Sequence, residues 1–123
     1  MTHAINWFEI PVADYKRAKQ FYENVLGKSI TDMPMDGVEY GMLPHDDINQ
    51  GVGGGLIKSE HSKPSQDGVT VYLNGGDDLS APLSRVEDAG GKVIIPKTAI
   101  GDHGFMAQFI DSEGNKIALH SLN

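Results

Sequence analysis

The sequence contains no cysteine, which excludes disulfide bonds and thiolate chemistry and fits a reducing compartment. It has no apolar run near the ~20 residues that span a bilayer, and its opening residues lack the charged and apolar regions of a secretory signal. Basic residues are also scarce, because 10 Lys and Arg against 17 Asp and Glu give a net charge of −7. Such a charge disfavours binding to phosphate backbones and anionic lipids. We therefore expect a cytoplasmic protein whose main partner is neither nucleic acid nor membrane.

The chain carries an internal repeat at an offset of 64 residues. Asp14 matches Asp78 and Lys28 matches Lys92 in that register, and 64 is about half of the 123 residues. A repeat of this length indicates two copies of one supersecondary unit, with a site expected between them. The length fits one domain. We place a first module at about 1–60, a linker at about 60–67 and a second module at about 68–123.

Each module is predicted to have the order βαβββ, which gives an α+β fold. Alternation of polar and apolar residues predicts a strand over 5–12. Asp14 is a suitable N-cap for a following amphipathic helix, which Gly27 ends. The second module repeats this order, with a strand over 69–74 and a helix over 79–89. Further strands are predicted over 28–33, 38–43, 51–58, 92–96, 105–110 and 116–121.

This order, with two motifs, resembles the glyoxalase/bleomycin-resistance/extradiol-dioxygenase proteins, also called vicinal oxygen chelate proteins. One motif is the Val-x-Asp, Phe-Tyr and Leu-Gly run within 12–27, and the other is the Asp-x-Glu-Gly-Asn turn at 111–115. The resemblance implies two βαβββ modules that form a curved, cup-shaped mixed sheet, with helices outside and a site inside. It also implies a homodimer.

Many members of this group hold a divalent metal with His and Glu side chains. The resemblance places those ligands at Trp7, Val71, Ala118 and Gly54 of this sequence, and none of these residues can donate to a metal. A divalent site needs about three protein nitrogen or oxygen ligands. We therefore expect no metal and no other cofactor, although a slip of one residue in the strand around Val71 stays open.

Glu9 and His120 are the candidate catalytic residues. Strand alternation places Glu9 on the face of Trp7 and His120 on the face of Ala118, so both are expected to point into the cup. An imidazole near a carboxylate can transfer protons near neutral pH. The alternative is that both side chains are solvated at the rim.

The candidate ligand-binding residues are Trp7, Glu9, Met42, Met106 and His120. Trp7 could stack on a planar or cationic ligand, or it could fill the space of the missing metal. Met42 and Met106 match at the 64-residue offset and either form an adaptable wall of the cup or belong to the core. The glycine-rich segment 51–55 fits a bent strand and could leave room for a ligand.

Three functions follow from these observations. We favour a protein that binds a small organic molecule in the cup between its modules without the usual metal site. The first alternative is a glyoxalase-like lyase, isomerase or dioxygenase-type enzyme that uses Glu9 and His120 or an unorthodox metal site. The second is a non-catalytic structural or interaction domain. Whether the protein is an enzyme stays open at this point.

Overall fold

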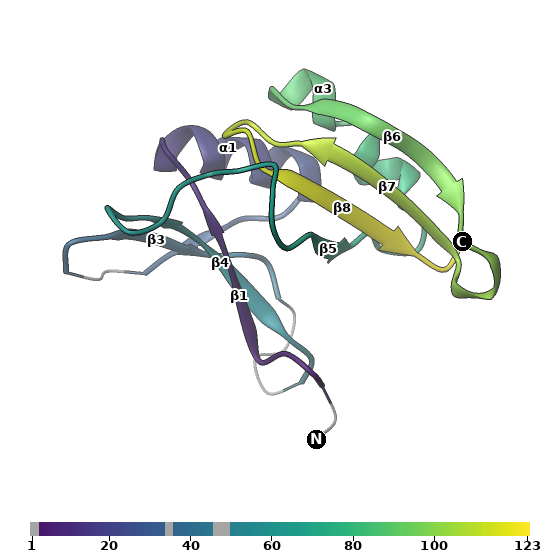
Figure 1. Ribbon diagram of the computed structural model, residues 1–123, viewed down its shortest axis with the longest axis horizontal. Helices are drawn as coiled ribbons and strands as arrows, with labels where there is room; N and C mark the ends of the chain where they lie inside the picture. Colours follow the sequence, from purple (N-terminus) through teal and green to yellow (C-terminus); the bar gives the residue numbers. More distant parts are fainter. Residues whose placement is uncertain (1–2, 34–35, 46–49) are drawn as a thin grey trace.

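The computed structural model describes residues 3–33, 36–45 and 50–123, and it contains two βαβββ modules (Figure 1). Module one consists of β1 (Trp7–Pro11), α1 (Tyr15–Leu26), β2 (Thr31–Asp32), β3 (Glu39–Met42) and β4 (Gly53–Lys58). Module two consists of β5 (Val71–Asn74), two short helices α2 (Ser80–Leu83) and α3 (Val86–Ala89), β6 (Lys92–Ala99), a 3₁₀ turn η1 (Gly101–His103), β7 (Phe105–Ile110) and β8 (Lys116–Ser121).

The strands form two four-stranded mixed sheets of the same topology. The strand order is β1-β4-β3-β2 in sheet one and β5-β8-β7-β6 in sheet two. The first strand of each module lies parallel to the last strand, and the other neighbours are antiparallel. The predicted α+β class and the two βαβββ modules are therefore confirmed. Each sheet stays open, so the strands do not close into one barrel.

Helix α1 has the predicted bounds because its end signals are local. The Asp14 carboxylate accepts a hydrogen bond from Arg17 N at 3.1 Å, as an N-cap does. Gly27 adopts φ 72°, the left-handed conformation that ends a helix, and donates its N–H to Glu23 O. The buried side of the helix carries Ala18, Phe21, Tyr22 and Val25.

The second helix differs from the prediction, because residues 79–89 form two short helices rather than one. The amide of Arg85 donates to Pro82 O, three residues back, so the α-helical ladder tightens and breaks there. The Arg85 guanidinium leaves the helix and donates through Nε to Val25 O of α1 at 3.0 Å. A hydrogen bond thus joins the residue at the break to the other module.

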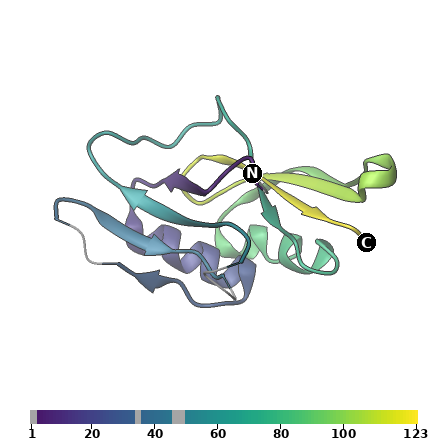
Figure 2. The same ribbon diagram turned by 90° about the horizontal axis from the view of Figure 1, so that it is seen from below.

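Both modules share one apolar core. The buried residues of the core come from α1, both sheets and the short helices, and they include Ile10, Phe21, Val86 and Phe109. Helix α1 packs against α2 and α3, and Figure 2 shows these helices side by side beneath the strands. No helix among the residues described is long and apolar enough to cross a membrane.

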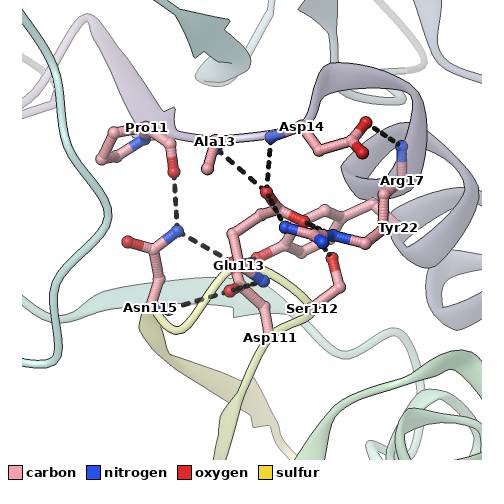
Figure 3. Close-up of polar contacts among 9 residues, drawn as sticks. All are labelled: Pro11, Ala13, Asp14, Arg17, Tyr22, Asp111, Ser112, Glu113 and Asn115. Atoms are coloured by element: carbon pink, nitrogen blue, oxygen red, sulfur yellow. Dashed lines mark hydrogen bonds and ion pairs between the residues drawn. The ribbon is translucent and has the colours of Figure 1, made fainter.

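The Glu113 carboxylate joins the modules. It comes from the β7–β8 turn and reaches the start of α1, where it accepts hydrogen bonds from the amides of Ala13 at 2.9 Å and Asp14 at 2.7 Å (Figure 3). Arg17 donates to both carboxylate oxygens, at 2.7 and 3.0 Å, and Ser112 Oγ donates to one of them. Burial alone would raise the pKa of Glu113, but these hydrogen bonds outweigh it and hold the pKa below its ordinary value.

Asp111 and Asn115 complete this inter-module junction. The buried Asp111 accepts from the Tyr22 hydroxyl of α1 at 2.5 Å and from the Asn115 amide and side chain. Asn115 in turn donates to Pro11 O of β1 at 2.7 Å and accepts from Ser65 N. The Asp-x-Glu-Gly-Asn motif therefore holds the two modules together.

Candidate functional site

Each sheet has one face packed on the helices and an outer face that no described helix covers. In β1, Phe8 and Ile10 pack into the core, so Trp7 and Glu9 lie on the outer face. The outer face of sheet one also carries Met42, whose register partner is Gly55. In the equivalent place on sheet two, Met106 pairs with His120. The predicted ligand-binding residues therefore lie on two faces, with Trp7, Glu9 and Met42 on one and Met106 and His120 on the other.

The gapless 64-residue offset places two of the expected metal-ligand positions on the wrong face. Gly54 packs against the ring of Phe8 and Val71 packs on the core, so both face the helices. Register shows that the outer-face equivalents are Gly53, opposite Trp7, and Tyr72, opposite Ala118. The slip by one residue reverses the face of a strand.

Trp7, Tyr40 and Glu9 form a linked group on the outer face of sheet one. Trp7 Nε1–H donates to the Tyr40 hydroxyl at 2.6 Å. Burial raises the pKa of Tyr40 above its ordinary value, as does the neighbouring Glu9 carboxylate, whereas the Trp7 hydrogen bond lowers it. Since the Tyr40 hydroxyl already accepts from Trp7, its own proton is free to donate to Glu9. The Glu9 carboxylate therefore lies near the Tyr40 hydroxyl.

Glycines in β4 make room for these rings. A Cβ atom on Gly53 would lie 2.9 Å from the Trp7 ring, and one on Gly55 would collide with the Tyr40 ring. The glycine-rich strand therefore accommodates the protein's own aromatic side chains, which occupy space that the sequence analysis left for a ligand. Trp7 nevertheless keeps 37% of its surface exposed.

The residues at the four ligand positions of the outer faces do not fit the metal that the fold family implies. Trp7, Gly53, Tyr72 and Ala118 offer an indole, a phenol and two groups without donor atoms. Among residues 3–33, 36–45 and 50–123, no three His, Cys, Asp or Glu side chains gather in a group that could hold a metal ion. We therefore derive no step that depends on a metal.

His45 is not among the residues that the sequence predicts for the site. Its imidazole lies near Gly53, beside the Trp7 ring, and its Nδ1 is buried without a hydrogen-bond partner in the described part of the chain. It borders a hollow of about 270 Å³ next to Met42 and Thr31. Only its position three residues after the end of β3 could have placed it near this face.

A larger hollow of about 510 Å³ lies at the end of β5 and β8 on sheet two, bordered by Tyr72, Asn74, His120 and Leu122. Its volume falls within the range of about 300–1,000 Å³ that is usual for small-molecule sites. Tyr72 is 51% exposed there. His120 Nε2 lies 2.6 Å from the carbonyl oxygen of His103 in η1.

Glu9 and His120 are not brought together within one chain. They lie on different sheets, and no hydrogen bond joins them among the described residues. Their catalytic roles stay predictions.

Comparison with known proteins identifies the family of this fold. Residues 4–119 match the model of the Glyoxalase/Bleomycin resistance protein/Dioxygenase superfamily. The chain belongs to this superfamily. The suspected resemblance is thereby confirmed.

The relatives are of two lengths. CFP32 of Mycobacterium bovis is 27% identical over 121 aligned residues, and the match covers 96% of this chain and 45% of that protein. Glyoxalase I of Zea mays, solved as an E144Q mutant, has a TM-score of 0.72 at 24% identity and is matched over 94% of this chain and 46% of the maize chain. TnmS3, an antibiotic binding protein from Streptomyces sp. CB03234, has a TM-score of 0.65 at 24% identity over 100% of this chain and 99% of its own. The chain thus spans about half the length of the mycobacterial and maize proteins, and the two structural similarities establish the fold alone.

Proposed function

We propose that the protein binds a small organic molecule, without the metal typical of the superfamily, between the outer face of sheet one and the outer face of sheet two from a second copy. The observation that carries this proposal is the Trp7–Tyr40 pair on Gly53 and Gly55. The pair offers apolar ring surface around the Trp7 position, which the resemblance assigns to a metal ligand, and the Glu9 carboxylate lies on the same face. Aromatic surface with a few placed polar groups is the usual lining of a small-molecule site.

The relatives support a ligand of this kind. TnmS3 is named as an antibiotic binding protein, and its length is that of this chain. It establishes no ligand for this chain, but it supports a binding function that does not require catalysis. The cytoplasmic location, and the lack of nucleic-acid and membrane partners, stay predictions.

The double length of other relatives supports the second copy. CFP32 and maize glyoxalase I are about twice as long as the region that matches this chain. A homodimer of this chain would contain about as many residues as one chain of those relatives. The exposed rings of Trp7 and Tyr72 are 37% and 51% accessible in one chain, and a facing sheet would cover them.

Trp7 provides the direct test of binding, because it is the protein's only tryptophan. Its fluorescence is titrated with a panel of planar aromatic molecules, and each is also tested by thermal unfolding. A true ligand gives saturable quenching and a higher midpoint, with about 2.7 kcal/mol of added stability at a hundred times its Kd. Stoichiometric Zn, Ni, Mn or Fe that survives dialysis and is lost when Glu9 or His120 is changed to alanine would overturn the metal-free site.

Mixing two defective variants tests the second copy. Trp7→Ala and His120→Ala each damage every site in their own homodimer, but a mixed dimer regains one intact site. After equilibration of an equal mixture, about a quarter of the wild-type sites should return. A monomer in sedimentation, or a mixture with no recovery, contradicts a site that is shared between copies.

A further inference from the structure

The hydrogen bond between His120 and His103 determines which ring nitrogen carries the proton. The carbonyl oxygen of His103 can only accept, so His120 Nε2, 2.6 Å away, must donate. A neutral imidazole has one N–H. His120 Nδ1 is therefore a lone-pair acceptor in the neutral ring.

Asn74 provides the complementary group. It is the register partner of His120 on the adjacent parallel strand and borders the same 510 Å³ hollow. Its Oδ1 accepts from Gly76 N at 2.8 Å, which orients the side-chain amide. The Asn74 Nδ2 group is a donor only. One residue with a free acceptor and one with a donor thus lie opposite each other on adjacent strands and border the same hollow.

Tyr72 adds a flat apolar surface beside this pair. Its side chain is half exposed, lies in β5 two residues before Asn74 on the same outer face, and borders the hollow. Aromatic side chains favour stacked or edge-on contact with planar partners. The hollow therefore combines a stacking surface with a donor–acceptor pair.

We propose that this hollow binds planar ligands with a cis-lactam or primary carboxamide edge. The ligand N–H donates to His120 Nδ1, its carbonyl accepts from Asn74 Nδ2, and its ring lies on Tyr72. This inference rests on the proposed binding function and adds the chemical class of ligand. It also makes the His103 carbonyl a positioning group, because that carbonyl selects the tautomer.

Calorimetry with two matched probes tests the inference. 2-Quinolone has the lactam edge, and 1-methyl-2-quinolone keeps the ring and carbonyl but lacks the N–H. We expect the methylated probe to bind at least tenfold more weakly. The ratio should fall to about one in His120→Phe, which keeps a ring of similar shape without the acceptor.

Asn74→Asp tests the hydrogen bond to the ligand carbonyl separately from the hydrogen bond to His120. It keeps the oxygen that accepts from Gly76 N but removes the Nδ2 donor. Both probes have the carbonyl, so both should weaken by a similar factor of about ten while their ratio is kept.

The tautomer has its own readout. In ¹⁵N-labelled protein at about pH 8.5, where imidazoles are ordinarily neutral, correlation spectra should show a proton on His120 Nε2 and none on Nδ1. A proton on Nδ1 overturns the inference, as does equal binding of the two quinolones, an unchanged ratio in His120→Phe, or no binding of 2-quinolone. If other panel molecules still quench Trp7 in that last case, only the ligand class falls and the proposed function stands.

Discussion

Replacing Glu113 with alanine should destabilise the protein by removing hydrogen bonds between its two modules. The side chain is fully buried, with 0% of its surface exposed, and its carboxylate accepts hydrogen bonds from the amides of Ala13 and Asp14 and from Arg17. A net hydrogen bond to a charged group contributes about 1.5–3 kcal/mol. Both amides belong to exposed residues and Arg17 is half exposed, so water can replace part of each contact.

The low end of that range therefore applies, and the two amide bonds together predict a loss of about 3 kcal/mol. For a domain of this size such a loss lowers the unfolding midpoint by about 10 °C. Glu113→Gln keeps an accepting oxygen but loses the charge, so its midpoint should fall between those of Glu113→Ala and the wild type. Thermal unfolding by circular dichroism measures all three, with Glu60→Ala, an exposed carboxylate in the linker, as the control.

The pH dependence provides a second test of the same contact. The hydrogen bonds lower the pKa of Glu113 in the folded state, so its stabilising effect is full above the unfolded pKa and is lost as pH falls through the folded value. The difference in unfolding midpoint between wild type and Glu113→Gln should therefore become smaller below about pH 4. A midpoint in Glu113→Ala within 2 °C of wild type, or a gap that widens in acid, would refute the role given to this carboxylate.

Three further predictions concern other contacts. Gly55→Ala should displace the Tyr40 ring, reduce stability by about 1–3 kcal/mol and shift the Trp7 fluorescence emission. Tyr40→Phe should also change the Trp7 emission, with a smaller loss of stability. A larger loss of stability in Tyr40→Phe than in Gly55→Ala would contradict the packing described. Tyr22→Phe removes a buried donor from Asp111 and should cost about 2 kcal/mol in denaturant unfolding, and a neutral effect would contradict that bond. Hydrogen bonds from the first amide of α2 and from a lysine lower the pKa of Asp78 to about 2. The unfolding midpoint of Asp78→Asn should therefore be lower than that of the wild type near neutral pH and should equal it near pH 2. A difference in midpoint that persists in acid argues against this linkage.

The sequence predicted the elements whose signals are local. The bounds of α1, β7 and β8 agree with the prediction because a capping carboxylate, a terminal glycine and short-range alternation determine them. β2 is only Thr31–Asp32, shorter than predicted, and β6 extends to Ala99 beyond the predicted end at 96. These lengths depend on pairing with neighbouring strands, which composition does not encode.

The site was predictable only in part. Alternation alone placed Trp7 and Glu9 on one face, and the structure has them there. The offset of 64 could not reveal the one-residue slip that moves Tyr72 outward, because each strand tolerates either face until its partner is known. The roles of Gly55 and His45 depend on rings brought in from other strands, and no spacing along the chain records such contacts.

The inter-module junction is separate from the larger hollow. The acidic turn by which the chain is recognised lies at one end of β8, while the imidazole that borders the larger hollow lies near the other end. The residues of the turn hold the two modules together, whereas the residues around the hollow take no part in that junction. In this chain the turn therefore accounts for the arrangement of the modules, and the chemistry of the hollow depends on other side chains.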